Sequence, residues 1–226
     1  PGDLGFDAMH INTHKTLSTP HGGGGPGSGP VCVAARLLPF LPQPKVHKNA
    51  EGLYSLSEDA PQSIGYIAPY YGNFSIIVRA YAYMLMCGGN GFQRISENAV
   101  LSANYVRERL APWYEQKYER SCMHECVLSA SRQSALGVNA LDIAKALLDR
   151  GFHAPTIYFP LIVPEALMIE PTETESKQTL DEFCEAMIAI AKLAEENPEE
   201  LKKAPLSTPV GRLDEVTAAR QPLLRV

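Results

Sequence analysis

The sequence predicts an α/β fold, in which helices pack against short sheets. Apolar runs of strand character alternate along the chain with longer segments whose apolar residues recur at the helical period. Glycines directly follow several of the helical segments, as expected of residues that end helices, and prolines interrupt the connections. With 226 residues, of which 45% are hydrophobic and 20% charged, the chain is typical of a globular protein with one large or two small domains.

The first half of the chain predicts strands, then a proline-broken stretch, then two helices. The expected elements are strands at 6–12 and 31–35, extended pieces broken by Pro39, Pro42 and Pro44 up to Val46, a hairpin or loop at 50–65, and helices at 74–86 and 92–110. The first helix is strongly apolar and ends at Gly88-Gly89, whereas the second is amphipathic and ends before Pro112.

The second half predicts a smaller α/β sandwich. The expected elements are strands at 125–130, 157–163 and 166–170 and helices at 139–150 and 176–196. Their order, strand–helix–strand–strand–helix, is typical of two packed layers. The helix at 139–150 ends at Gly151, and its expected apolar face consists of Leu141, Ala144, Leu147 and Leu148. Residues 197–226 are polar and rich in proline, which favours a wrapping tail or partner contact over core.

Charge and cysteine usage narrow the classes of function. A net charge of −5 gives no basic field for nucleic acid or for an anionic membrane surface. The chain also lacks an apolar run of roughly eighteen residues, so no transmembrane helix is expected. Its five cysteines are odd in number and widely scattered, which favours reduced thiols in a cytoplasmic protein over a disulfide framework.

The most informative residue is a lysine between the first predicted strand and a glycine-rich loop. Lys15 follows His14, and six of the eight residues from Gly22 to Gly29 are glycine. A lysine amine is nucleophilic once burial or a neighbouring positive charge lowers its pKa. Such an amine, next to bare backbone N–H groups, suits an aldehyde cofactor that is held as a Schiff base and also carries an anion. A surface lysine and a flexible linker are the alternatives, and the loop's place directly after a strand argues against a linker.

These residues resemble a known family. The runs that carry the resemblance are Asn12-Thr13-His14-Lys15-Thr16, Ser18-Thr19-Pro20-His21-Gly22-Gly23-Gly24-Gly25-Pro26-Gly27, Tyr71-Gly72-Asn73-Phe74, Cys122-Met123-His124-Glu125, Gly151-Phe152-His153-Ala154-Pro155-Thr156 and Glu170-Pro171-Thr172-Glu173-Thr174-Glu175. They resemble glycine dehydrogenase (decarboxylating), the P-protein of the glycine cleavage system. The likeness covers most of the chain and is nearest to the pyridoxal-phosphate-bearing subunit, subunit 2, of the bacterial type.

The resemblance implies the fold of fold-type-I enzymes that depend on pyridoxal phosphate, similar to aspartate aminotransferase. Residues 1–111 would then be the C-terminal part of the large cofactor-binding domain, residues 112–200 the small C-terminal α/β domain, and residues 201–226 a tail. It also implies that the chain is a C-terminal fragment, which we expect to be inactive alone.

The resemblance further implies a catalytic role for Lys15, which would carry pyridoxal 5′-phosphate. The other cofactor-binding residues that it implies are His14, Asn12, Gly22, Gly23, Gly24, Gly25 and Asn73. The implied reaction removes the carboxylate of glycine as CO₂ and passes the aminomethyl group to the lipoyl arm of the H-protein. The implied partners are the H-protein and a second P-protein subunit or N-terminal half, in a dimer or heterotetramer.

Several alternatives stay open at the level of sequence. Asn73 also has the character of a helix N-cap, and Arg132 has that of a surface arginine rather than a carboxylate ligand. Two metal sites are conceivable, one from Cys122, His124 and Cys126 and one from His10, His14 and His21, but neither spacing matches a zinc motif, and no metal is predicted. The alternative functions are another fold-type-I decarboxylase of amino acids and a scaffold without catalysis.

Overall fold

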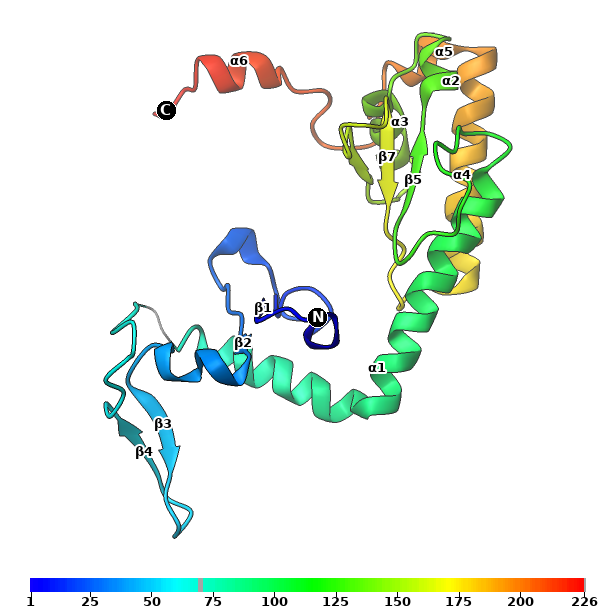
Figure 1. Ribbon diagram of the computed structural model, residues 1–226. Helices are drawn as coiled ribbons and strands as arrows, with labels where there is room; N and C mark the ends of the chain where they lie inside the picture. The colour runs from blue at the N-terminus through cyan, green and yellow to red at the C-terminus, as the bar shows by residue number, and fades with distance from the viewer. Residues whose placement is uncertain (69–70, 226) are drawn as a thin grey trace. The chain divides into compact units, whose positions relative to one another are not determined.

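The computed structural model describes residues 1–68 and 71–225 (Figure 1). Val226, the last residue of the predicted tail, lies outside these residues. The described chain forms two compact units, Pro1–Asn90 and Gly91–Val226. The division falls within the long helix, earlier than the domain boundary after residue 111 that the sequence predicts.

Unit 1 contains two small antiparallel sheets. In the first sheet, β1 (Ala8–His10) pairs with β2 (Val31–Val33). The loop 11–30 joins these strands, and the N–H of Ile11 donates to the carbonyl of Pro30 at 3.0 Å, so the loop closes at its base. In the second sheet, β3 (Lys45–Lys48) pairs with β4 (Tyr54–Ser57). Three short 3₁₀ helices complete the unit before the long helix: η1 (Gly2–Leu4), η2 (Gly22–Gly24) and η3 (Ala35–Phe40).

The structure corrects three expectations in unit 1. The two strands of the first sheet are shorter than predicted, because only three residue pairs align between them. Residues 35–40 form η3 instead of extended chain, since the fixed φ of Pro39 suits a 3₁₀ turn as well as an extended segment. The predicted hairpin exists but begins at Lys45, where its first strand precedes a turn that the side chain of Asn49 holds.

The long helix α1 (Phe74–Leu110) is interrupted where the two glycines stand. Gly88 has φ 63° and ψ 178°, which is outside the helical region and is open to glycine at little cost. The prediction of one helix before this point and another after it is therefore confirmed. Although α1 has 37 residues, neither it nor any other helix within residues 1–68 and 71–225 is long and apolar enough to cross a membrane.

Unit 2 contains a three-stranded antiparallel sheet covered by helices. The strands are β5 (Cys126–Ser129), β6 (Thr156–Ile157) and β7 (Ala166–Ile169), in the order β5-β7-β6. The helices after α1 are α2 (Ser131–Ser134), α3 (Ala140–Leu148), α4 (Lys177–Glu196), α5 (Pro198–Leu201) and α6 (Glu215–Arg220). Within this unit α3 and α4 lie against the sheet (Figure 1), which gives the predicted two-layer arrangement.

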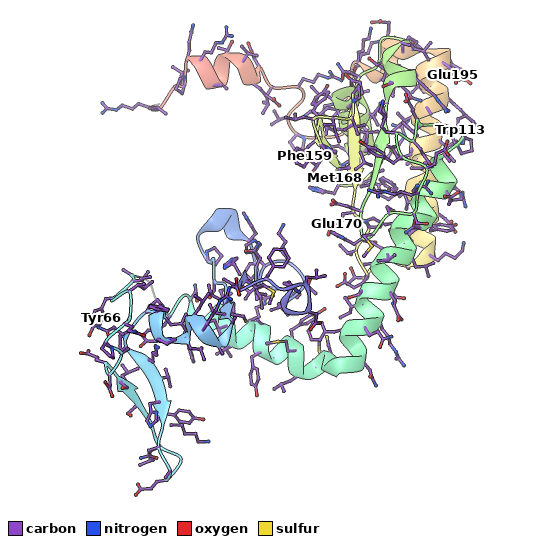
Figure 2. All side chains as sticks on the ribbon, viewed as in Figure 1. Tyr66, Trp113, Phe159, Met168, Glu170 and Glu195 are labelled. Carbon is purple, nitrogen blue, oxygen red and sulfur yellow. The ribbon has the colours of Figure 1, made fainter. Side chains whose placement is uncertain are left out.

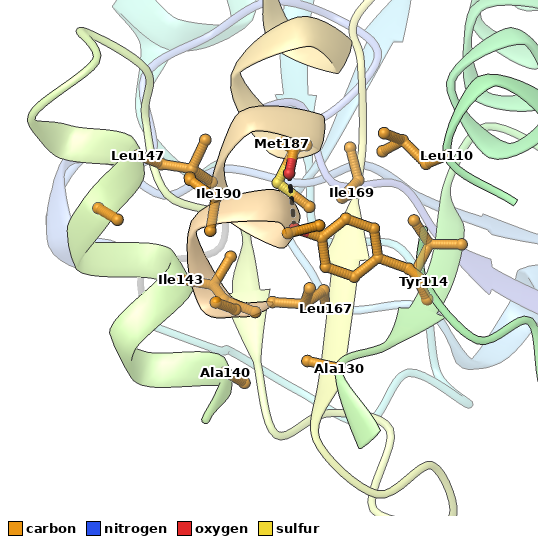
Figure 3. Close-up of a cluster of buried hydrophobic side chains, with 14 of the residues drawn as sticks. Leu110, Tyr114, Ala130, Ala140, Ile143, Leu147, Leu167, Ile169, Met187 and Ile190 are labelled. Carbon is orange, nitrogen blue, oxygen red and sulfur yellow. Dashed lines mark hydrogen bonds between the residues drawn. The ribbon is translucent and has the colours of Figure 1, made fainter. Parts of the chain in front are cut away.

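The core of unit 2 lies between the sheet and these helices. Leu128 and Leu167 face it from the strands, Ile143 from α3, and Met187 and Ile190 from α4. Tyr114 is fully buried beside them, and its hydroxyl donates to the carbonyl of Met187 at 2.9 Å (Figure 3). A buried hydroxyl with its hydrogen bond made adds both packing and orientation to the core.

Three expectations for unit 2 are corrected. The strand predicted at 157–163 ends at Ile157, because Tyr158 has a φ of 58° and a turn follows in which Val163 donates to the carbonyl of Pro160. Leu141 and Leu148 are only half-buried, and Ile143 takes their place in the core. The predicted tail is also partly core, since Leu201 and Ala204 are buried in it.

Candidate functional site

Lys15 lies in a tight loop between β1 and the glycine run. The N–H of Lys15 donates to the carbonyl of Asn12 at 3.3 Å, and the N–H of Ser18 donates back to the carbonyl of Lys15 at 3.1 Å. The N–H of Thr19 donates to the carbonyl of Thr13 at 3.2 Å and closes the loop. The side chain of Lys15 is exposed, and within the described residues its amine makes no hydrogen bond or ion pair. The amine is therefore presented to solvent on a stretch of backbone that hydrogen bonds fix.

Two histidines lie edge to face beside this lysine. The rings of His14 and His21 have centroids 4.7 Å apart and an interplanar angle of 88°. Burial lowers the pKa of His14, and the positive charges of His21, Lys15 and His10 lower it further. His14 is consequently neutral at pH 7, so one ring nitrogen donates and the other accepts. Its Nδ1 is buried and has no hydrogen-bond partner among the described residues.

Asn12 belongs to the same group through His10. The Nε2 of His10 lies 2.8 Å from the Oδ1 of Asn12, which fixes the orientation of the amide. Both residues are near the surface of unit 1. Asn12, His14 and Lys15 thus lie on one short stretch, which the hydrogen bond from the N–H of Lys15 to the carbonyl of Asn12 turns back on itself.

The glycine run folds into η2 and leaves only part of its amides open. Gly22, Gly23 and Gly24 have φ values of 55°, 65° and 94°, a region that residues with a side chain rarely adopt. The N–H of Gly24 donates to the carbonyl of His21, and that of Gly25 donates to the carbonyl of Gly22. Among the described residues, the amides of Gly22 and Gly23 make no backbone hydrogen bond. Of the four glycine amides that the sequence predicts for an anion, those of Gly22 and Gly23 are therefore open.

The start of α1 adjoins the end of the glycine run. A Cβ on Gly72 would lie 2.6 Å from the Oγ of Ser28, and Gly72 has a φ of 62°, so glycine suits this position. The Oγ of Ser28 is buried and has no hydrogen-bond partner among the described residues. Asn73 follows, and its side chain accepts a hydrogen bond from the N–H of Ile76 at 3.4 Å, which confirms its interpretation as a helix cap.

Neither metal site weighed from the sequence assembles among the described residues. The metal-compatible group that they form instead is His124, Glu125 and Glu170, whose ligand atoms lie within 4.8 Å of one another. The antiparallel pairing of Cys126 with Ile169 places Glu125 opposite Glu170. Glu170 follows the last residue of β7 (Figure 2). Burial raises the pKa of Cys126 to about 12, so its thiol stays protonated and is a poor ligand.

His153, from one of the runs that carry the resemblance, and Arg132, weighed from the sequence, lie in unit 2. His153 lines a cavity of about 280 Å³ with Phe152, Glu170 and Phe183. Arg132 donates from Nη1 to the carbonyl of Pro112 at 2.8 Å, which confirms its interpretation as a surface arginine with a structural bond.

Sequence reasoning missed Thr13, Thr19 and Ser28. Thr13 and Thr19 are buried in unit 1, 1% and 7% exposed, and their hydroxyls are hydrogen-bonded to each other. No residue pattern signals this pairing, because the two threonines meet only when the loop closes. Their place inside the motif around Lys15 is the one clue that the sequence offers.

Comparison with known proteins identifies the family. The family described as "Glycine dehydrogenase, C-terminal domain" matches residues 95–207. A protein named "Probable glycine dehydrogenase (decarboxylating) subunit 2" from Lysinibacillus sphaericus is 60% identical over 225 residues, and one of the same name from Halalkalibacterium halodurans is 61% identical over 225 residues. The whole chain aligns with each of them, and it spans 46% of the length of these curated relatives.

Solved structures show the fold. A crystal structure of glycine decarboxylase (P-protein) of the glycine cleavage system matches 84% of this chain and 44% of its own, with a TM-score of 0.68 at 19% identity. A cysteine desulfurase from Thermococcus onnurineus NA1 matches 84% of this chain and 48% of its own, with a TM-score of 0.59 at 16% identity. These likenesses confirm the predicted fold class, that of fold-type-I enzymes. By the family match and the relatives at about 60% identity, the chain belongs to the glycine dehydrogenase (decarboxylating) family.

Proposed function

We propose that this chain supplies the cofactor lysine and part of the cofactor site for the decarboxylation of glycine, with transfer of the aminomethyl group to the lipoyl arm of the H-protein. The observation that carries the proposal is the fixed, exposed Lys15 between His14 and the positive-φ glycines. The names of the relatives, "Probable glycine dehydrogenase (decarboxylating) subunit 2", support the reaction.

The residues of unit 1 fit pyridoxal phosphate. Two buried polar atoms near Lys15, His14 Nδ1 and Ser28 Oγ, have no partner among the described residues, as expected of groups that serve a ligand. The open amides of Gly22 and Gly23 suit an anionic group such as a phosphate. Lys15, His14, Asn12, the glycines Gly22 to Gly25, and Asn73 at the start of α1 would hold the cofactor.

Lys15 and His14 have distinct roles in the proposed reaction. Lys15 would hold the cofactor through its side-chain amine and so place it for glycine. Neutral His14 would help to hold the cofactor without adding a positive charge next to Lys15. Pyridoxal phosphate, when bound, supplies a ring that takes up the electron pair left behind as the carboxylate departs as CO₂.

The proposed partners are the H-protein and a second P-protein subunit or N-terminal half, in a dimer or heterotetramer. The word "subunit" in the relatives' names supports a second chain. We also propose a cytoplasmic location, which the five cysteines support because each of them is a free thiol.

The exchange of label between bicarbonate and the carboxyl group of glycine tests the proposal. In the holoenzyme that contains this chain, we expect exchange that requires lipoylated H-protein and is lost on Lys15→Ala. Lys203→Ala removes an exposed lysine of unit 2 and is the matched control, with exchange retained. Exchange with a larger amino acid but not with glycine would show a different decarboxylase, and a holoenzyme that takes up no cofactor would indicate a scaffold.

A further inference from the structure

Two buried threonines clamp the loop that carries Lys15. The hydroxyl of Thr19 donates to the Oγ1 of Thr13 at 3.1 Å, and the N–H of Thr19 donates to the carbonyl of Thr13 at 3.2 Å. The hydroxyl of Thr13 in turn donates to the carbonyl of Ser28 at 2.7 Å. One hydroxyl therefore ties both ends of the loop 13–19 together and ties the loop to the end of the glycine run.

The two threonines of this clamp are buried. In the described part of unit 1, Thr13 and Thr19 are the polar residues that are buried as a whole, at 1% and 7% exposure. Hydrogen bonds are strengthened where water is excluded, and a buried group that loses its partner is destabilising. The side chain of Lys15 makes no hydrogen bond within residues 1–68 and 71–225, so the backbone between the two threonines sets where this side chain starts.

We propose that Thr13 and Thr19 are positioning residues, which set the place and the approach direction of the Lys15 amine relative to the glycine run. The inference rests on the proposed function, because it assigns a role within the same site. Neither threonine contacts the reacting atoms in this account; each acts through the backbone of the loop. A small displacement of a reacting group lowers the reaction rate strongly, and a shift of about 1 Å is associated with a loss of about 10²-fold.

The two threonines differ in how many bonds depend on them. Replacing Thr13 by the isosteric valine leaves the carbonyl of Ser28 without its donor and the hydroxyl of Thr19 without its acceptor. Replacing Thr19 by valine removes only the bond between the two side chains, and the backbone bond from Thr19 remains. The effect of Thr13→Val should therefore exceed that of Thr19→Val.

The test follows uptake of pyridoxal phosphate by the holoenzyme after its cofactor has been removed. The readouts are the rate at which the visible absorbance of lysine-bound pyridoxal phosphate appears, and the pH midpoint of that absorbance. Thr16→Val is the matched control, because Thr16 lies in the same loop, is exposed and makes none of these bonds. Thr13→Ser keeps the hydroxyl and serves as the rescue variant.

We expect Thr13→Val to slow uptake by about tenfold or more and to move the pH midpoint, with a smaller effect from Thr19→Val. Thr16→Val and Thr13→Ser should behave as wild type. If Thr13→Val does not fold, the comparison of Thr19→Val with Thr13→Ser still tests the inference. Thr19→Val keeps the bond from Thr13 to the carbonyl of Ser28 and loses only the bond between the two threonines. Uptake by both valine variants at the wild-type rate, with an unchanged midpoint, would overturn the inference alone. A wild-type enzyme that binds no cofactor at Lys15 would overturn the proposed function as well.

Discussion

The guanidinium of Arg212 lies 2.7 Å from the carboxylate of Asp142, whose side chain is only 4% exposed. Arg212 also donates from Nε to the carbonyl of Ala204 at 2.7 Å. Asp142 belongs to the capping box of α3, because its carboxylate accepts from the N–H of Asn139 at 2.9 Å. One ion pair thus fastens the segment after α5 to the first turn of α3.

Breaking this pair should destabilise unit 2. Arg212→Ala leaves the buried Asp142 carboxylate without its cation, and we expect a loss of about 2 kcal/mol in unfolding free energy. The value is below that of a fully buried pair because a third of the Arg212 side chain, 34%, is exposed to water. Urea unfolding followed by the fluorescence of Trp113, the single tryptophan, measures it. Arg225→Ala, at an exposed arginine, is the control, and equal midpoints for the two variants would contradict the prediction.

The buried hydroxyl of Tyr114 should contribute less to the free energy of unfolding than the ion pair of Arg212 with Asp142. Tyr114→Phe removes the hydrogen bond to the carbonyl of Met187 but keeps the ring, so we expect a loss of about 1 kcal/mol. Tyr118→Phe, at a tyrosine that is 51% exposed, should change the unfolding free energy little. A midpoint for Tyr114→Phe that coincides with that of Tyr118→Phe would show that the bond contributes nothing.

Asp149 should make the stability of unit 2 depend on pH in the acid range. Desolvation raises the pKa of Asp149, but hydrogen bonds from Ser207 and Leu206 outweigh it, and the net pKa lies below the ordinary value of 3.8. The ionised Asp149 carboxylate therefore stabilises the fold at pH values above the pKa that Asp149 has in the unfolded chain. This stabilisation is lost as the pH falls through the lower pKa that Asp149 has in the folded chain. Asp149→Asn should lower the melting temperature at pH 7, with the difference from wild type shrinking below about pH 4. A difference that is constant from neutral to acid pH would contradict the assignment.

His14 should titrate below the ordinary histidine value of 6.5, because burial and then His21 disfavour its charged form. Since the folded pKa is the lower one, stability falls as pH decreases through about 6.5 towards the folded pKa. Histidine-selective NMR of the chain measures the pKa directly. His21→Gln should raise the pKa of His14, whereas His47→Gln, in β3 outside the lysine loop, should not. A pKa of His14 that is unchanged by His21→Gln would show that the ring pair is not formed.

The elements of unit 2 follow from local signals in the sequence. Ser176 accepts from the N–H of Thr179 and begins α4 next to where the pattern predicts, and Asn139 caps α3 in the same way. The strand predicted at 157–163 fails because an apolar run alone does not distinguish a strand from a turn, and here Phe159, Leu161 and Ile162 are exposed. Only the backbone at Tyr158, which reverses the chain, decides between them.

The candidate site is also predictable from the sequence only in part. Lys15, His14 and the glycine run are adjacent in sequence, so their meeting in space was predictable. The hydrogen bonds within η2, which occupy the amides of Gly24 and Gly25, depend on the φ values of the glycines, and glycine permits many. The pairing of Thr13 with Thr19 likewise exists only in the closed loop. Residue identity thus predicts which groups gather, and loop closure determines which of their hydrogen bonds remain open.

Covalent trapping of the cofactor tests the central claim most directly. The holoenzyme that contains this chain would be reduced with borohydride in the presence of pyridoxal phosphate, digested, and its peptides mapped by mass spectrometry. The account predicts a pyridoxyl group on Lys15 and none on Lys45 or Lys48, which lie in β3. A folded holoenzyme that carries no label on Lys15, or carries it on another lysine, would contradict the account.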